Sequence, residues 1–352
     1  MKLTRRTLIQ AAAAAVPLAT LPRFARAGEG PILHASWGGG VGDTWQKAFA
    51  TPYQTDTGTD VRIVEIPNPE AQFRAQAGAP QYHSGICTYV QANNLMRDGL
   101  VETFDPEELP EMQNIDKKYW LTTPDGKLAG VTPYFAYYGI GMNANEAKVE
   151  DFSSWKNLAD PEWKGRIGLT RPIYLSTYDL TIMSKAMGGD EFHIDGGMEL
   201  LKGTAKNMLS VASSLAQQNA MLERGEVAAM PFYSVRVWSL NEAGADYVRI
   251  VIPDEGALLL PYVIVAPKGV ADRDMVAKWL NYIASAAPQE RGVALSGYIP
   301  GNNDAKATDE IVRKLGMPFD ELRAKLYQPD WDFIARHQKE RVDAIEKMMA
   351  EL

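Results

Sequence analysis

Residues 32–42 read ILHASWGGGVG, an apolar run that ends in a dense group of glycines. The run predicts a buried strand followed by a tight turn. Apolar residues then recur at helical spacing from Asp43 to Thr57, just before Gly58, and a second apolar strand follows at 61–66. Strand, turn, helix and strand in this order predict the first unit of a mostly parallel sheet covered by helices.

The alternation of strands and helices occurs twice along the chain. The first set ends near residue 99, and a second set with different strands begins after residue 125. No flexible linker divides the two sets, so we expect an α/β fold of two lobes that share crossing strands near 131–142 and 253–266. Each lobe is expected to be a mixed, mostly parallel sheet flanked by helices, with a ligand cleft between the lobes. The expected boundaries are 28–136 with 259–305 for lobe 1, and 137–258 with 306–352 for lobe 2.

The composition is that of a folded, acidic protein. The 352 residues include 36 Lys and Arg against 44 Asp and Glu, a formal charge of −8. The first 27 residues hold five of the bases and no acid, so the remainder carries 31 bases against 44 acids, or −13. An acidic body argues against nucleic acid or an anionic membrane surface as the main partner. No later apolar stretch reaches the length of about 20 residues that a membrane-spanning helix needs.

Residues 1–27 have the pattern of an export signal. Two arginines, Arg5-Arg6, precede a weakly apolar, alanine-rich run, and Ala25 and Ala27 supply the small residues of a cleavage site. Paired arginines before such a run favour the twin-arginine route, with a general secretory signal as the alternative. No cysteine near the cleavage site offers a lipid anchor. We expect an exported protein that works in the periplasm.

Motifs of common enzymes and metal sites are absent from the sequence. The chain has no HExxH, GxSxG or GxxxxGK[ST] pattern and no cluster of Cys and His residues. Its four histidines are scattered, and the single Cys87 has no partner for a disulfide or a metal pair. We therefore expect no catalytic residues, no metal and no cofactor.

Two stretches of the first half suggest a binding site instead. Trp37 and Gly38 begin the glycine turn, whose backbone N–H groups can face an anion at a helix start, although a turn needed only for packing explains it equally well. An aromatic stretch follows at 134–138. Alternate residues of a strand share a face, so Tyr134 and Tyr138 either pack in the core or line a cleft together.

Two strand-to-helix loops of the second half have a common design. The loops at 170–177 and 231–236 each combine an aromatic residue, a hydroxyl at the helix start and an arginine. An arginine holds a carboxylate or phosphate with two parallel hydrogen bonds, and the hydroxyl either caps the helix or binds the anion. The alternative for the arginines is an ordinary surface position. The candidates are Arg171, Ser176, Thr177, Tyr233 and Arg236, together with Tyr298 from a later glycine-flanked loop.

Five short motifs occur in a fixed order along the chain. They are Ala35-Ser36-Trp37-Gly38-Gly39, Gly99-Leu100-Val101, Gly139-Ile140-Gly141-Met142-Asn143, the run from Gly225 to Met230, and the run from Pro253 to Ala257. Their order resembles that of periplasmic solute-binding proteins of ABC transporters, in the group that binds polyamines, ferric iron and small organic solutes. The resemblance implies a type II periplasmic-binding-protein fold with two crossing strands. It also implies a monomer that closes on a small-molecule solute and delivers it to an ABC permease in the inner membrane.

The resemblance also implies positions for the site residues. It places Trp37, Gly38 and Thr88 in lobe 1, Tyr134 at the hinge, and Arg171, Ser176, Thr177, Tyr233 and Arg236 in lobe 2. Polyamine binders of the family place carboxylates in these loops, whereas this chain has arginines, and iron binders offer adjacent tyrosines, whereas only Tyr233 stands there. We hypothesise a small organic solute that bears a carboxylate or similar anion, zwitterions included. A polyamine is the alternative ligand, and an exported enzyme or a sensory module on the same fold is the alternative class.

Overall fold

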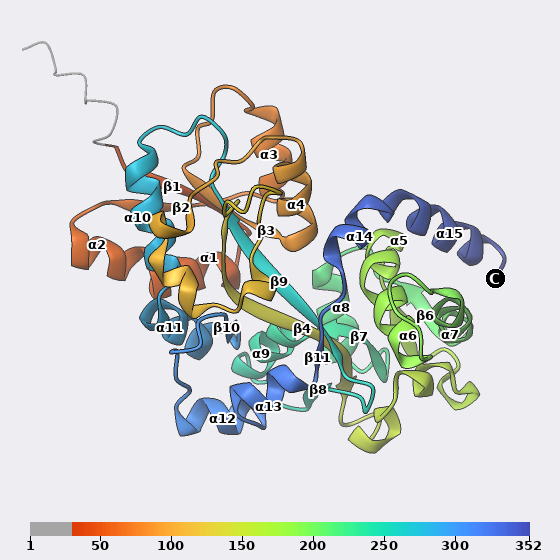
Figure 1. The fold of residues 1–352 in the computed structure, drawn as a ribbon. Coiled ribbons are helices and arrows are strands. Elements are labelled where there is room, and N and C mark those ends of the chain that lie inside the picture. The colour runs from red at the N-terminus through yellow and green to blue at the C-terminus, as the bar shows by residue number, and fades with distance from the viewer. Residues whose placement is uncertain (1–29) are drawn as a thin grey trace, which may run out of the picture.

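The structure is a computed structural model that describes residues 30–352, so the export signal predicted at 1–27 lies outside the described residues. Figure 1 shows two α/β lobes joined by two long strands that run from one lobe to the other. Within the described residues, no helix is both long and apolar enough to cross a membrane.

Lobe 1 is built on three parallel strands, with the first in the middle. Its strands are β1 (Ile32–Ser36), β2 (Val61–Glu65) and β3 (Ser84–Thr88), and β1 pairs in parallel with both others. Its helices are α1 (Gly40–Thr44), η1 (Trp45–Ala50), α2 (Thr51–Thr57), α3 (Pro69–Ala75), α4 (Tyr89–Arg97), α10 (Arg273–Ala284) and α11 (Ala286–Ser296). The first three form one helical segment that is π-helical in its middle. It connects β1 to β2, as the opening residues predicted.

Lobe 2 repeats this organisation. Its strands are β5 (Ile167–Leu169), β6 (Met208–Val211), β7 (Ala229–Tyr233) and β8 (Val248–Val251), and β5 pairs in parallel with β6 and β7. Its helices include α5 (Pro172–Tyr174), η8 (Leu175–Asp179), α6 (Leu180–Ala186), α7 (Asp195–Ala205), α8 (Leu215–Glu223) and α9 (Ser234–Glu242). One helical segment therefore follows β5 and another follows β7, so both begin at the same edge of the sheet.

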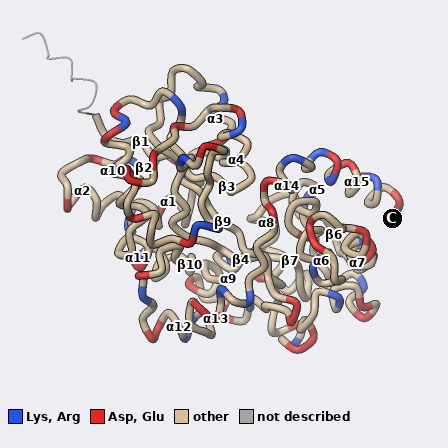
Figure 2. The backbone as a smooth tube through the Cα atoms, viewed as in Figure 1, with Lys and Arg blue, Asp and Glu red and all other residues tan. Residues whose placement is uncertain are grey.

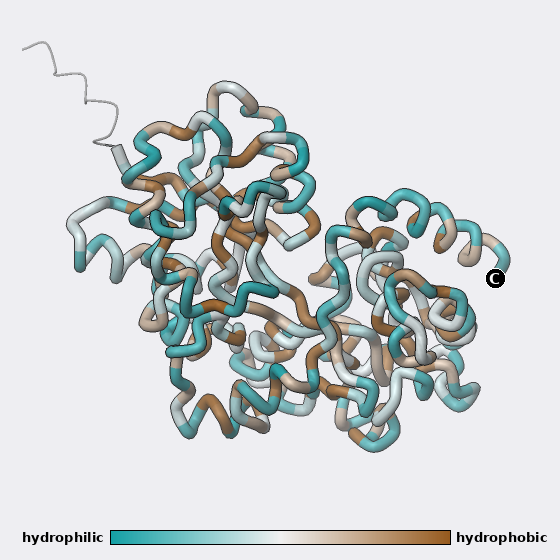
Figure 3. The backbone as a smooth tube through the Cα atoms, viewed as in Figure 1, coloured by the Kyte–Doolittle hydropathy of each residue, from teal (hydrophilic) through white to brown (hydrophobic). Residues whose placement is uncertain are grey.

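The crossing strands are β4 (Val131–Asn143) and β9 (Ala257–Val265), which pair antiparallel with each other. β9 continues into lobe 1 beside β3, whereas the second half of β4 pairs with β7 and β8 in lobe 2. Every residue of both strands is buried, neither strand holds a charged residue, and both are tan along their length in Figure 2. In Figure 3 the hydrophobic segments follow the interior strands, and the outer loops are largely hydrophilic. The predicted two-lobed α/β fold with crossing strands is confirmed.

The C-terminal segment connects the lobes a second time. It contains α12 (Asp309–Leu315), α13 (Phe319–Ala324), α14 (Trp331–Arg336) and α15 (Gln338–Ala350), with the two-residue strands β10 (Ile299–Pro300) and β11 (Leu326–Tyr327) pairing with β4 and β9. α14 packs on α4 of lobe 1, where Asn93 Nδ2 donates to Asp332 Oδ1 at 2.7 Å. α15 packs on lobe 2, where the buried Arg341 donates to the Ser176 carbonyl.

Two local features position the aromatic stretch and the C-terminal helices. The aromatic stretch 134–138 lies inside β4, because pairing with β9 on one side and with β10 or β7 on the other keeps it extended. The helical run at the C-terminus ends at Arg336 and restarts at Gln338. His337 between them has φ −103° and ψ 12°, outside helical geometry, so α14 can lie on lobe 1 while α15 lies on lobe 2.

Candidate functional site

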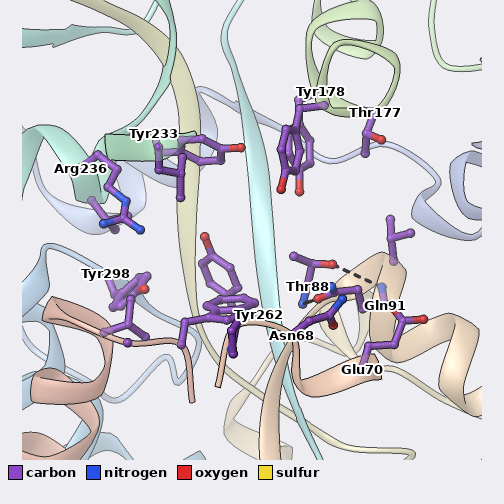
Figure 4. Close-up of a pocket in the computed structure, with 18 of the residues that line it drawn as sticks. Asn68, Glu70, Thr88, Gln91, Thr177, Tyr178, Tyr233, Arg236, Tyr262 and Tyr298 are labelled. Carbon is purple, nitrogen blue, oxygen red and sulfur yellow. Dashed lines mark hydrogen bonds between the residues drawn. The ribbon is translucent and has the colours of Figure 1, made fainter. Parts of the chain in front are cut away.

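A cavity of about 630 Å³ lies between the lobes, at the carboxyl ends of their parallel strands. Lobe 1 lines it with the turn after β1, the starts of α3 and α4, part of β9 and the end of α11. Lobe 2 lines it with the helix starts after β5 and β7 (Figure 4). A volume in this range suits a small organic molecule. The lining residues used below are Trp37, Gly38, Asn68, Glu70, Thr88, Gln91, Tyr262 and Tyr298 from lobe 1, and Tyr174, Thr177, Tyr178, Tyr233 and Arg236 from lobe 2.

Most of the residues that the sequence singled out line this cavity. They are Trp37, Gly38, Thr88, Thr177, Tyr233, Arg236 and Tyr298. They come from five separate segments of both lobes, so their convergence follows from the fold and not from any single motif.

Three of the singled-out residues do not line the cavity. Tyr134 is buried behind the wall, where its ring stacks on that of Tyr298 with 4.2 Å between centroids. Ser176 is fully buried, and its hydroxyl donates to the Ile173 carbonyl one helical turn back. Arg171 is exposed, and its guanidinium lies over the Tyr174 ring and donates to that tyrosine's hydroxyl at 3.2 Å.

The cavity is walled by aromatic rings from both lobes. In lobe 1, the Trp37 ring meets that of Tyr262 edge to face at 5.5 Å, and Tyr298 lies edge-on to Tyr262 at 5.6 Å. In lobe 2, Tyr174 and Tyr178 are parallel at 6.1 Å, an arrangement that follows from their spacing of four residues along one helical segment. Ring faces of this kind hold an apolar chain, and the hydroxyl edges hydrogen-bond to polar groups.

The hydroxyls of four buried tyrosines of the cavity, Tyr178, Tyr233, Tyr262 and Tyr298, stay protonated at neutral pH. Burial raises the pKa of Tyr262 to about 12, against a smaller lowering by the nearby charge of Arg236. Burial likewise raises the pKa of Tyr178, Tyr233 and Tyr298. Neutral hydroxyls both donate and accept hydrogen bonds, so they can meet either kind of polar group on a solute. Among residues 30–352, no group of three or more His, Cys, Asp or Glu side chains gathers as a metal site requires.

Arg236 is the positive charge of the cavity wall. It is the third residue of α9, and Figure 4 shows its side chain extending toward the cavity on the side where Tyr233 and Tyr298 lie. Its charge lowers the pKa of the Tyr262 and Tyr298 hydroxyls, against the larger effect of burial. Within residues 30–352 it has no hydrogen bond and no ion pair. A half-buried guanidinium without a carboxylate partner is a ready site for an anionic group.

The polar residues at the other side of the cavity were missed by the sequence analysis, apart from Thr88. Thr88 and Gln91 form a reciprocal cap at the start of α4, with Gln91 N donating to Thr88 Oγ1 and Thr88 N to Gln91 Oε1. Asn68 caps α3 by accepting a hydrogen bond from Ala71 N at 3.1 Å. Glu70, in the first turn of α3, is the acid that lines the cavity. The sequence did contain a clue to these residues, because each of them stands near the start of a helix that follows a strand.

The glycine turn is not the anion-binding turn that its sequence suggested. Gly39 has φ 68°, a left-handed conformation that favours glycine, and the turn leads into α1. The carboxylate of Glu65 lies against the turn, since a Cβ atom at Gly38 would meet Glu65 Oε2 at 2.9 Å and one at Gly42 would also collide with this side chain. A negative charge already occupies this position and opposes a second anion there.

Two further acids of lobe 2, Glu255 and Asp179, do not line the cavity. Glu255 accepts hydrogen bonds from Ser154 Oγ and Trp155 N. Asp179 is fully buried, accepts a hydrogen bond from Tyr138 Oη at 3.1 Å on Oδ2, and has no partner for Oδ1 within residues 30–352. Burial raises the pKa of Asp179 to about 8, against smaller lowering by hydrogen bonds, so this carboxyl is largely protonated at neutral pH.

A family model described as bacterial extracellular solute-binding protein matches residues 48–318, which is most of the chain. This chain belongs to that family. A relative from Haemophilus influenzae, spermidine/putrescine-binding periplasmic protein 1, is 24% identical over 262 residues, covering 72% of this chain and 71% of the relative. The solute-binding role in ABC transport, which the resemblance implied, is thereby confirmed.

Solved structures of other solute-binding proteins share the fold. An ABC transporter substrate-binding protein from Bradyrhizobium japonicum matches with TM-score 0.76 and 17% identity, covering 91% of this chain and 98% of that one. The GABA receptor Atu4243 matches with TM-score 0.74 and 18% identity, covering 92% and 98%. These structures and the family are transport receptors rather than enzymes, and the Haemophilus relative is periplasmic. At 17% and 18% identity, the similarity to these structures shows that the fold is shared and does not indicate which ligand this solute-binding protein takes.

Proposed function

We propose that this solute-binding protein works as a monomer in the periplasm. There it captures a small organic solute that bears a carboxylate, phosphonate or similar anion, and it delivers the solute unaltered to an ABC permease. The lobes are proposed to meet within β4 and β9, near residues 136 and 258. The observation that carries the proposal is Arg236, a cation in the cavity wall without an acidic partner in residues 30–352.

The energetics favour an anion at Arg236. A charge-assisted hydrogen bond contributes roughly 1.5–3 kcal/mol, and the aromatic walls keep water away from the pair. A polyamine is the second candidate, because the Haemophilus relative is named for spermidine and putrescine. It needs carboxylates along its length, but Glu70 is the acid that lines the cavity, and Arg236 repels an ammonium group.

The test is a thermal-shift screen of the purified protein with carboxylates, phosphonates, amino acids and polyamines. Solutes with an anionic group are expected to raise the midpoint of unfolding, with a stabilisation of about 2.7 kcal/mol at 100 times the Kd. Stabilisation by polyamines alone would contradict the proposal. Mass spectrometry of the recovered solute separates a receptor from an enzyme, because a receptor returns it unchanged.

The residue-level test compares Arg236→Gln with Arg249→Gln, which removes the same charge from an exposed position of lobe 2 outside the cavity. Calorimetric titration with the best anionic solute is expected to give a Kd about 10- to 100-fold weaker for Arg236→Gln, because the charge-assisted bonds are lost. Arg249→Gln is expected to bind like the parent. An unchanged or tighter Kd in Arg236→Gln would reverse the assigned sign of the ligand's charge.

A further inference from the structure

We propose that the cavity has a second charged subsite at Glu70, and that the solute is a zwitterion whose ammonium group and anion are separated by an apolar chain. The inference rests on the proposed function, since it takes Arg236 as the position of the anion. It adds the residue that selects the other end of the molecule.

The negative charge of Glu70 is only partly neutralised by its neighbours. One of its oxygens, Oε1, pairs with Arg74 at 3.1 Å, but Arg74 also pairs with Asp98 at 2.6 Å. Two carboxylates therefore share one guanidinium, and one negative charge is left over. The Glu70 side chain is only 18% exposed, so this charge is less screened by water than that of a surface acid.

The other polar side chains near Glu70 in the cavity wall carry no charge. They are Asn68 at the start of α3 and Gln91 and Asn94 of α4. The oxygens of Asn68 and Gln91 already accept hydrogen bonds from Ala71 N and Thr88 N, so Glu70 is the acceptor that the three protons of an ammonium group would meet with a full negative charge. Glu65, beside the glycine turn, adds a further negative charge to the lobe 1 side.

Arg236 and Glu70 lie at opposite ends of the cavity in Figure 4, with tyrosines between them. Tyr178 and Tyr233 approach from lobe 2 and Tyr262 from lobe 1. The cavity is thus polar and positive at one end, aromatic in the middle, and negative at the other end. A chain with an anion at one end and an ammonium at the other matches this order. A monoacid makes no ionic contact with Glu70, and a diamine places an ammonium group against Arg236.

The two charged residues also belong to different lobes, Arg236 to α9 and Glu70 to α3. A zwitterion that contacts both has more favourable contacts when the lobes are together than when they are apart. Only such differential affinity shifts an equilibrium between open and closed arrangements. A monoacid makes an ionic contact with only one lobe, so closure adds less to its binding free energy. The same pair of contacts therefore selects the zwitterion and favours the closed arrangement.

The test measures the Kd of straight-chain ω-amino acids of roughly four to eight carbons, each beside the monoacid and the diamine of the same length. For the parent protein, the best ω-amino acid is expected to bind at least tenfold tighter than its monoacid. Glu70→Gln is expected to abolish this preference, because the ω-amino acid loses its ionic partner while the monoacid, no longer facing a negative charge in the cavity, binds no weaker than to the parent. Glu107→Gln, which removes an exposed acid of lobe 1 outside the cavity, is expected to keep the preference.

A second variant changes the preference in the opposite direction. Arg74→Gln frees Glu70 from its cation, so the preference for the ω-amino acid over the monoacid is expected to rise severalfold. A preference that survives Glu70→Gln, or that falls in Arg74→Gln, would overturn the Glu70 subsite while leaving the anion site intact. A diamine that binds tighter than the monoacid would instead overturn the proposed function itself.

Discussion

Lobe 1 and lobe 2 present their cavity walls on the same kind of element, the turn or helix start that follows a strand, but the two walls differ in charge. The wall of lobe 1 has Glu70, and Glu65 lies against its glycine turn. The wall of lobe 2 has Arg236. The shared element supplies the place for a ligand, and a few side chains on it decide which ligand is recognised.

A buried titratable group of lobe 1 is a base and one of lobe 2 is an acid, which is the reverse of the charges on their cavity walls. Lobe 1 buries a base, His34, whose ring lies 4.1 Å from that of Trp45 and whose Nδ1 is 2.8 Å from Ser84 Oγ. Burial lowers the pKa of His34 to about 3. Lobe 2 buries an acid, Asp179, whose pKa burial raises to about 8. Both groups are therefore mainly neutral near pH 7, and the charge of the cavity comes from its surface residues.

The largest expected effect is the pH dependence that Asp179 gives to lobe 2. Between pH about 4 and 8 the carboxyl is ionised in the unfolded chain but protonated in the folded one, so the folding free energy becomes less favourable as pH rises. Asp179→Asn cannot ionise, and its stability relative to the parent is expected to rise by up to about 1.4 kcal/mol per pH unit over this window. Chemical denaturation at a series of pH values measures it.

Asp246→Asn is the matched control, because Asp246 is an exposed acid of the same lobe. It is expected to keep the pH dependence of the parent. If Asp179→Asn also kept it, Asp179 would be ionised in the folded protein, which would contradict the assignment of a neutral buried carboxyl.

Lobe 1 is expected to show the opposite dependence over a narrower window. Below pH about 6.5, His34 is protonated in the unfolded chain but stays neutral in the folded protein down to pH about 3, so the contribution of His34 to stability falls as pH falls and opposes that of Asp179 where the two windows overlap. His34→Gln is expected to lose this slope of about 1.4 kcal/mol per pH unit, whatever its packing costs at neutral pH. His193→Gln, at an exposed histidine, serves as the control in the same denaturation series. An identical slope in His34→Gln and the parent would mean that another group causes the acid sensitivity.

The smallest expected effect distinguishes two arginines that the sequence treats alike. Arg171→Gln is expected to change the Kd for an anionic solute by less than about threefold, because Arg171 is exposed and does not itself line the cavity, although it contacts the wall residue Tyr174. Calorimetric titration beside Arg236→Gln makes the comparison direct. A loss in Arg171→Gln as large as that in Arg236→Gln would show that the loop after β5 moves into the cavity when the solute binds.

These two arginines illustrate what the sequence can and cannot predict about the site. Both follow a strand, and their loops look alike in sequence. Arg171 is the residue before α5, whose first residue is Pro172, whereas Arg236 lies on the third position of α9. Three positions along a helix correspond to a rotation of roughly 300° about the axis and a rise of about 4.5 Å, so a small difference in where a helix begins moves a side chain toward or away from the cavity.

The crossing strands were predictable, and the aromatic wall was predictable only in part. β4 and β9 are long runs without charge, so their burial follows from composition alone. Tyr134 and Tyr298 were both candidates, but they stack on each other, and only Tyr298 reaches the cavity. Glu70 lies far from Arg236 in the chain, and only the tertiary arrangement of the two lobes brings them to one cavity. Periodicity carries no information about such a pairing.

The most direct test of the account is a crystal structure of the protein with the most stabilising solute of the screen. We expect the solute between the lobes, its anionic oxygens within hydrogen-bond distance of the Arg236 guanidinium and its chain against the tyrosines. A solute bound elsewhere, or one whose ammonium group occupies the position beside Tyr262 and Tyr298 with Arg236 turned away, would contradict it.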